Sequence, residues 1–458
     1  MNALIISAVL GVVMMFSGIL LKQKSAIRTV AIAGILVLLG MSILDLKGIQ
    51  LFSIDTREMI VFDHFALVFN TVIFAVVLLY LLLSAPDMEK VGVNYAEYFA
   101  LIFFILCGAA LVTSFKSLLI LFLGIEIISI PLYILTGSDK RNLKGNEAAL
   151  KYFLLGSFST GLMLMGIALL YGARASFSTV ISPAIIPQNM SLLYTGMILL
   201  LFAMAFKVSA APFHFWTPDV YDGAPTVFTS FMATIVKVVV FFGFIRLFDD
   251  MFEPQQGQWR LWVTVITAVT LFIGNITAVF QQSVKRMLAY SSIAQAGFML
   301  FALYAMSGDG KEGLMLYTVA YSAATIGIFA VLARMSDYTF DGFNGLAKSQ
   351  PMVAATLTVF LLSLAGIPLT AGFMAKFYML KAALGTPGSL WLVIFAVIMA
   401  AVSVYYYFRV IQAMYFKEPG DTPHPAFPSF FKGMLLVLAF LVILLGVYPE
   451  LLLGRLYF

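Results

Sequence analysis

The chain has 458 residues, of which 62% are hydrophobic and only 11% are charged, and its formal net charge is +5. Soluble domains are about 45–50% apolar and about 25% charged, so this composition excludes a soluble protein and predicts an integral membrane protein in contact with a lipid bilayer. No clustered basic face is evident, which argues against a nucleic-acid partner.

Residues that build cofactor sites are scarce. The single cysteine, Cys107, excludes a disulfide framework and any zinc or iron–sulfur site made of several cysteines. Only three histidines are present, so a histidine-rich metal site is not expected. The glycine-rich dinucleotide fingerprint is also missing from the sequence. We therefore expect no metal, no cofactor and no redox centre in this chain.

Apolar runs long enough to cross a membrane recur along the chain, separated by short polar loops. The first run has no basic residue before it and no convincing cleavage site, so it is predicted to be a retained helix. We expect about fourteen membrane-spanning helices. They are predicted at residues 2–22, 27–46, 62–84, 95–114, 116–136, 146–172, 192–221, 225–248, 259–281, 286–306, 312–335, 352–384, 388–416 and 429–452.

The loops indicate one membrane domain and its orientation. Residues 173–191 carry Pro183 and Pro187, and residues 417–428 carry four prolines, so both segments are predicted to interrupt helical structure. No loop is long enough to fold separately, and residues 1–458 are expected to form a single membrane domain. If the N-terminus is outside, fourteen basic loop residues face the cytoplasm and nine face outward. This bias predicts that both termini lie outside.

A weak internal repeat relates two groups of five helices, at residues 95–248 and 259–416. Ser114-Phe-Lys-Ser-Leu-Leu opens the second helix of one group, and Ser283-Val-Lys-Arg-Met-Leu opens the second helix of the other. Because five is an odd number, the second group enters the membrane from the opposite side, as in inverted-repeat transporters. The predicted fold is all-α and polytopic. Residues 1–94 form the helices before the repeats, and residues 429–458 form the helix after them. Chance similarity between apolar sequences is the alternative.

Two predicted helices contain a break beside a lysine. Pro212 lacks a backbone donor and clashes with the preceding turn, which should free carbonyls near Val208 that could solvate Lys207. In the run at 352–384, Gly366, Pro368 and Gly372 weaken the helix shortly before Lys376. Ordinary packing prolines are the alternative explanation, but broken helices with nearby charges are typical of transport sites.

Four charged residues, Glu126, Lys207, Lys237 and Lys376, lie near the middle of apolar runs. A charge at the bilayer centre costs about 2.5–3.5 kcal/mol on insertion scales. Such residues indicate a water-lined route for ions or protons, with Glu126 paired to Lys207 so that the carboxylate affects the lysine's affinity for its proton. Buried lysine can exchange protons, whereas arginine stays charged. A fixed structural pair is the alternative for Glu126 and for Lys237.

Three assignments stay open from the residues alone. Lys151 follows Glu147 by four residues, a spacing typical of solvated helix pairs, although it could also act in a relay. His214 could bridge Lys207 and Lys237 through water. Alternatively, its hydrogen bonds are simply satisfied inside the packed bundle. Lys376 could reach the outer surface if its helix starts late. The consecutive residues Tyr405, Tyr406 and Tyr407 are interpreted as packing or interface residues.

The motif at residues 211–226 reads Ala-Pro-Phe-His-Phe-Trp-Thr-Pro-Asp-Val-Tyr-Asp-Gly-Ala-Pro-Thr. With the helix count, the repeat and both breaks, it makes the chain resemble the antiporter-like membrane subunits of respiratory complex I. The Pro-Asp-Val-Tyr-x-Gly-Ala-Pro form is similar to the subunit N type of NADH:quinone oxidoreductase. These subunits are also related to those of multisubunit sodium/proton antiporters.

The resemblance implies a role for each charge. Counting the predicted spans in chain order, Glu126 in the fifth span matches the family's glutamate, and Lys207 in the seventh span matches the lysine paired with it. Lys237 in the eighth span matches the family's central lysine, and Lys376 in the twelfth span matches the residue that exchanges protons with the outside. Lys151 matches a lysine of the sixth span.

The resemblance also implies a bacterial inner-membrane location and an assembly with other membrane and peripheral subunits. Those partners would carry NAD, FMN, iron–sulfur clusters and quinone. A subunit of a stand-alone cation/proton antiporter and a purely structural scaffold are the two rival functions.

Overall fold

The computed structural model describes the chain except for residues 53, 181–188, 420–422 and 455–458. In the described part, thirteen helices are long and apolar enough to cross a membrane. The predicted run at 352–384 is found as two shorter helices, α15 (Pro351–Ala365) and α16 (Ala371–Leu384). The all-α polytopic prediction is confirmed. The described residues do not include Pro183 and Pro187 of the predicted loop at 173–191. They also do not include Arg455, which is one of the nine basic residues predicted to face outward.

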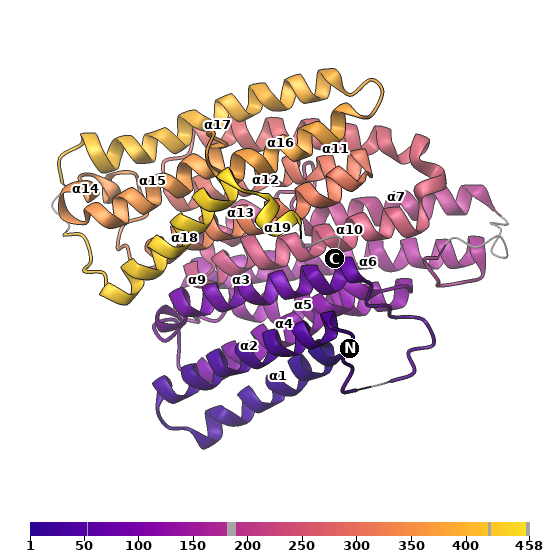
Figure 1. Ribbon diagram of the computed structural model, residues 1–458, viewed down its shortest axis with the longest axis horizontal. Coiled ribbons are helices and arrows are strands. Elements are labelled where there is room, and N and C mark those ends of the chain that lie inside the picture. The colour runs from indigo at the N-terminus through magenta and orange to yellow at the C-terminus, as the bar shows by residue number, and fades with distance from the viewer. Residues whose placement is uncertain (53, 181–188, 420–422, 455–458) are drawn as a thin grey trace. The chain divides into compact units, whose positions relative to one another are not determined.

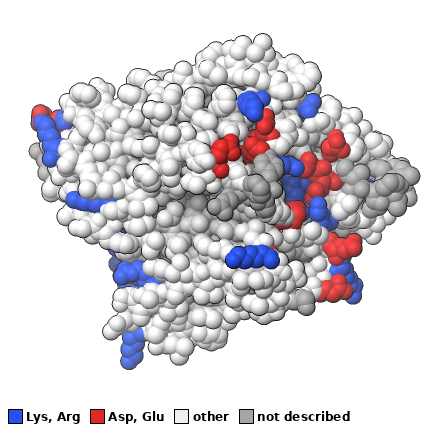
Figure 2. All heavy atoms as spheres, in the orientation of Figure 1, with Lys and Arg blue, Asp and Glu red and all other residues white. Residues whose placement is uncertain are grey.

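The surface suits a bilayer. Figure 2 shows a face on which most atoms belong to uncharged residues and the charged side chains occur in a few small groups. Large apolar side chains are exposed along several helices, for example Phe16 at 58% and Phe440 at 65%. A soluble monomer rarely exposes broad apolar surface, so these side chains are expected to face lipid or partner subunits.

The described chain divides into two compact units. The first unit contains Met1–Leu81, Met88–Val208 and Val236–Leu261, and the second contains Leu82–Asp87, Ser209–Ile235 and Trp262–Phe458. The predicted segment boundaries at 95–248 and 259–416 are not the boundaries of these units, and as repeat limits they stay predictions.

The first unit is a bundle of antiparallel neighbours in which α1 packs on α2 and α4, and α6 packs on α7 (Figure 1). Gly166 and Gly196 bring α6 and α7 together, because a Cβ on either glycine would lie within about 3.0 Å of the other residue's carbonyl oxygen. Small residues at such crossings are typical of membrane helices. The helices of this unit are α1 (Asn2–Leu20), α2 (Lys24–Leu46), most of α3 (His64–Met88), α4 (Tyr95–Ser114), α5 (Leu118–Thr136), α6 (Leu143–Arg174), α7 (Met190–Lys207), α10 (Lys237–Met251) and the start of α11 (Gln256–Val279).

In the second unit, α12 packs against α8, α13 and α16, while α15 packs against α17 and α18 (Figure 1). Its further helices are α8 (Trp216–Gly223), α9 (Thr226–Phe231), α12 (Val284–Ala305), α13 (Gly308–Leu332), α14 (Leu346–Ser349), α17 (Leu390–Phe416), α18 (Ser429–Val447) and α19 (Glu450–Leu453). The second unit also contains the helical turn η3 (Asp341–Phe343) and most of the π-helical turn η1 (Met232–Val236), whereas η2 (Glu253–Gln255) belongs to the first unit.

Both predicted breaks are present. Helix α7 ends at Lys207, and helical structure resumes only at α8, with Ser209 in between at a φ of 65°. Helix α15 ends before Gly366, at a φ of 85°, and Leu369 at 70° precedes α16. A positive φ is costly for residues other than glycine, so Ser209 and Leu369 are held there by their surroundings. Pro131, by contrast, lies inside α5 without ending it.

Each unit contains the same set of contacts around the start of its second repeat helix. In the first unit, the Leu118 amide donates to the Phe177 carbonyl at 2.8 Å; in the second, the Val284 amide donates to the Tyr338 carbonyl at 2.7 Å. Serine caps both helices, Ser117 before α5 and Ser283 before α12.

An arginine completes the pattern in each unit. Arg246 of α10 donates to the carbonyls of Thr113 and Phe115, which precede the capping serine by four and two residues. Arg409 of α17 donates to the carbonyls of Val279 and Gln281, which have the same spacing before their own capping serine. This repetition of specific contacts argues against chance similarity of apolar sequences and supports the five-helix repeat.

Gly372 sets how closely α16 approaches the end of α15, and replacing it should be costly. A Cβ at this position would overlap the Ser363 carbonyl, and the Gly372 amide already donates to Ser363 Oγ at 3.1 Å. We expect Gly372→Ala to lower the free energy of unfolding by about 1–3 kcal/mol through overpacking, measured by unfolding of the detergent-solubilised protein. Gly433→Ala in α18 is the control, because no heavy atom lies within 4 Å of that Cβ position. Equal stability of the two variants would contradict this prediction.

Candidate functional site

Lys207 and Glu126 meet in the first unit, as the sequence predicts. Lys207 ends α7 and is 8% exposed, and its Nζ donates to Ser129 Oγ on α5 at 2.9 Å. The same nitrogen lies 4.0 Å from Glu126 Oε1. Glu126 also accepts a hydrogen bond from Thr160 on α6 at 2.8 Å. A hydroxyl therefore makes the direct contact with the ammonium, while the carboxylate lies at the edge of ion-pair range.

Lys237 is the first residue of α10 and follows directly after the π-helical turn η1. It is 2% exposed within the first unit, where α10 packs against α4 and α7. π-Helical turns inside α-helices occur often at functional sites because they displace one side chain from the regular helical register. Nothing in the apolar sequence around Lys237 indicated this turn.

Lys376 lies in the second unit and binds the backbone that the helix break exposes. Its Nζ donates to the carbonyls of Leu364 at 2.8 Å and Ala365 at 3.1 Å. The last carbonyls of a helix have no partner within it, so the end of α15 offers two acceptors to the ammonium. The ring of Phe298 adds a cation–π contact at 4.6 Å.

These contacts bear on two expectations. Lys376 is 6% exposed, which favours an interior position, and the alternative in which it reaches the outer surface stays a prediction. The freed carbonyls that we assigned to Lys207 are instead found at Lys376. Lys207, the last residue of α7, instead lies beside α5 and donates to the Ser129 hydroxyl of that helix.

Neutral polar residues surround the Lys376 site. The amide nitrogen of Gln295 on α12 donates to the Leu364 carbonyl at 2.9 Å, the same oxygen that Lys376 uses, and to the Tyr407 hydroxyl at 3.1 Å. Tyr317 of α13 donates to the amide oxygen of Gln295, and Tyr407 shares a short hydrogen bond with Ser291. The site in the second unit is thus a hydrogen-bonded network of neutral side chains and backbone carbonyls around one ammonium.

A small cavity of about 10 Å³ lies within this network. Its walls include Lys376, Gln295, Tyr317 and Tyr321. The figure of about 10 Å³ is the volume open to the centre of a water-sized sphere, and a cavity needs about 10–15 Å³ of it to hold one water molecule. The space beside the Lys376 side chain is therefore sufficient for about one water, and its lining offers several hydrogen-bond partners.

Sequence reasoning missed the neutral members of this site. Tyr407, interpreted as a packing or interface residue, is fully buried and bonded to Ser291 and Gln295. Ser292 and Gln295 share one face of α12 at a spacing of three residues, and Tyr317 and Tyr321 share one face of α13 at a spacing of four. Polar residues at these spacings in otherwise apolar helices were the sequence signal that could have indicated a buried polar network.

The two secondary candidates have different surroundings. Lys151 Nζ lies 2.7 Å from Glu147, and both side chains are exposed, at 41% and 64%, as in a solvated helix pair. His214 belongs to the second unit, in the segment between α7 and α8, and is 5% exposed. Its Nδ1 has no hydrogen-bond partner among the described residues. The suggested bridge from His214 to Lys207 and Lys237 stays a prediction.

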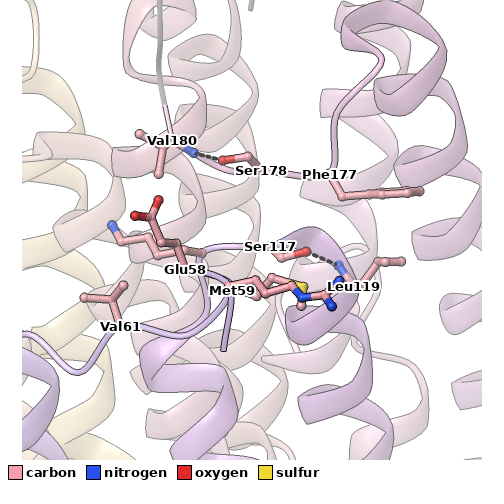
Figure 3. A pocket seen from close by; sticks show the side chains of 10 residues that line it. Glu58, Met59, Val61, Ser117, Leu119, Phe177, Ser178 and Val180 are labelled. Atoms are coloured by element: carbon pink, nitrogen blue, oxygen red, sulfur yellow. Dashed lines mark hydrogen bonds between the residues drawn. The ribbon is translucent and has the colours of Figure 1, made fainter. Parts of the chain in front are cut away.

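A larger cavity, of about 610 Å³, lies at the loop ends of the first unit. Figure 3 shows Glu58, Met59, Ser117, Phe177 and Ser178 around it. Glu58 and Met59 lie between α2 and α3, Ser117 precedes α5, and Phe177 and Ser178 follow α6. All are separate in sequence from Glu126, Lys207 and Lys237. The cavity is thus not built by the buried charges. Among the described residues, no group of three or more His, Cys, Asp or Glu could hold a metal ion.

The transmembrane family model for NADH:quinone oxidoreductases and Mrp antiporters matches residues 116–403. NADH-quinone oxidoreductase subunit N of Cytophaga hutchinsonii is 39% identical, over 99% of both chains. The chain belongs to the NADH-quinone oxidoreductase subunit N family. Its fold is similar to that of a chain in respiratory complex I from Thermus thermophilus with bound aureothin, at a TM-score of 0.85, 31% identity and 99% coverage of both chains.

A more distant likeness concerns the fold alone. This chain is similar to a chain of the Mrp complex from Dietzia sp., at a TM-score of 0.86 and 18% identity, over 99% of this chain and 96% of the other. The same fold therefore occurs in a redox-linked complex and in an antiporter complex. Function has to be argued from the site residues.

Proposed function

We propose that this chain is the proton-translocating, antiporter-like subunit of a bacterial NADH:quinone oxidoreductase. Protons taken up from the cytoplasm charge Lys207 and Lys237, pass along a hydrated central axis and leave through Lys376. The energy comes from redox chemistry in partner subunits, which carry the NAD site, FMN, the iron–sulfur clusters and the quinone site. The chain lies in the inner membrane with both termini outside.

The burial of three lysines carries this proposal. Lys237 and Lys376 are buried, and the Lys207 side chain is 8% exposed. Lys207 and Lys237 lie in helices apolar enough to span a bilayer, and Lys376 lies in α16 of the broken pair α15 and α16. Buried charges in membrane segments are expensive and mark transport paths by default. Lysine also exchanges protons under conditions in which arginine would stay charged. The exposed ion pair of Lys151 with Glu147 favours a solvated helix feature, so we leave Lys151 out of the central route.

The second candidate function is a subunit of a cation/proton antiporter without redox partners, which the shared fold and the family model keep open. The chain's similarity to proteins named subunit N over nearly their whole length favours the first function.

Purification of the tagged chain from its native membrane separates the two functions. We expect it to copurify with flavin- and iron–sulfur-bearing subunits, and the reconstituted complex to take up protons when NADH is supplied. Sodium-dependent proton exchange by a complex that lacks flavin would contradict the proposal and favour the antiporter.

A further inference from the structure

A line of neutral hydroxyl groups leads to the Lys376 site within the second unit. The Tyr221 side chain on α8 contacts that of Ser292 on α12. The hydroxyl of Tyr321 on α13 donates to Ser292 Oγ at 3.0 Å. Tyr321 also lines the one-water cavity, and Lys376 is another of its lining residues. The elements that carry these residues pack directly on one another, since α12 contacts α8, α13 and α16.

We propose that protons reach Lys376 through these hydroxyls, from Tyr221 through Ser292 and Tyr321 to a single water in the cavity. This inference rests on the proposed function and adds an uncharged pathway to it. Each hydroxyl can donate one hydrogen and accept another, so a proton arriving at one end can release a different proton at the other.

The transfer balances without an added reactant. The neutral Lys376 amine accepts a proton from the cavity water, and the water regains one from the Tyr321 hydroxyl. Tyr321 is resupplied by Ser292 and Ser292 by Tyr221, and Tyr221 takes up the proton that arrives at this end of the line. Rotation of the hydroxyls then restores their starting orientation. The proton leaves when the Lys376 ammonium releases it on its other side.

Unpaired polar atoms in the same unit support the presence of buried water. Buried polar groups are almost always hydrogen-bonded to protein or to ordered water. Several buried polar atoms of this unit have no partner among the described residues, and they lie on the helix break and on α8, α9, α11 and α13. Among them are Nδ1 of His214 and the hydroxyls of Ser209, Thr217, Ser230, Thr267, Ser322 and Thr325.

Gln295 has a positioning role in this arrangement. It binds the Leu364 carbonyl that Lys376 also uses, and it is held by Tyr317 and Tyr407. The amide therefore fixes the backbone acceptor of the ammonium. The Leu364 carbonyl keeps its hydrogen bond from Gln295 when the charge of Lys376 changes. The acceptor of the Lys376 amine therefore stays in place beside the cavity.

The test is Tyr321→Phe in the complete complex, reconstituted in liposomes, with NADH-driven proton uptake measured per flavin. The variant removes one oxygen and leaves too little new space for a second water. We expect proton uptake per flavin to fall to the level of Lys376→Met, and Ser292→Ala to have the same effect. Tyr406→Phe is the control, since Tyr406 is equally buried but bonds to Asn275 at 3.0 Å.

Normalisation to flavin separates transfer from assembly, because a structural defect lowers the amount of complex and not the uptake of each assembled copy. Full uptake by both Tyr321→Phe and Ser292→Ala, with uptake lost in Lys376→Met, would overturn this inference and leave the proposed function intact. Full uptake by Lys376→Met itself would overturn the proposed function.

Discussion

Replacing Lys376 with methionine is expected to lower NADH-driven proton uptake per assembled complex by about tenfold or more, because a positioned proton-transfer group contributes at least that much. Methionine keeps the unbranched shape and approximate volume of the side chain and removes its proton-carrying amine. The fold should survive, because the Leu364 carbonyl retains its hydrogen bond from Gln295 and the cost of a buried charge disappears.

Lys381→Met on the same helix is the matched control for Lys376→Met. Lys381 is 53% exposed and pairs with Asp309 at 3.1 Å, and surface pairs of this kind contribute little. We expect normal uptake and normal assembly from this variant. Equal uptake by both lysine variants, at equal flavin content, would remove Lys376 from the proton path.

Replacing Glu126 with glutamine is the second variant with a large expected effect. Glutamine can still accept the hydrogen bond from Thr160, and Lys207 keeps its bond to Ser129. Only the negative charge 4.0 Å from the ammonium is lost. Two unit charges about 4 Å apart attract by about 4 kcal/mol at an effective dielectric constant of about 20. Even a third of that energy changes the proton affinity of Lys207 about tenfold.

We therefore expect Glu126→Gln to assemble normally and to translocate protons several-fold more slowly, measured as uptake per flavin. Glu147→Gln is the control, because Glu147 belongs to the exposed pair with Lys151. Normal assembly with lost uptake would also argue against a purely structural scaffold. If Glu126→Gln pumped at the rate of its control, the carboxylate would be a structural partner only.

The helix breaks and the charged residues could be predicted from the sequence because their signals are local. Proline removes a helical hydrogen bond wherever it occurs, and α7 and α15 do end beside Pro212 and Pro368. A lysine in an apolar run is conspicuous for a similar reason, since lipid offers it no partner. Local signals of this kind are sufficient to single out Lys207, Lys237 and Lys376 in the amino-acid sequence.

The immediate surroundings of the lysines could not be predicted, because they depend on packing between segments far apart in sequence. The carbonyls of Leu364 and Ala365 reach Lys376 only because α16 folds back along the end of α15. Gln295 and Tyr317 are ordinary residues for an interior helix, and their roles follow from the face that each presents to its neighbour. The π-helical turn before Lys237 has no local sequence signal at all.

The hydration of the interior of the assembled complex tests the central claim most directly. A density map that resolves ordered water would show whether the buried lysines share one aqueous route. We predict a nearly continuous series of waters and polar side chains that joins Lys207, Lys237 and Lys376, with one water in the cavity beside Tyr321. Dry, apolar packing around these lysines, or side chains directed into lipid, would contradict the account.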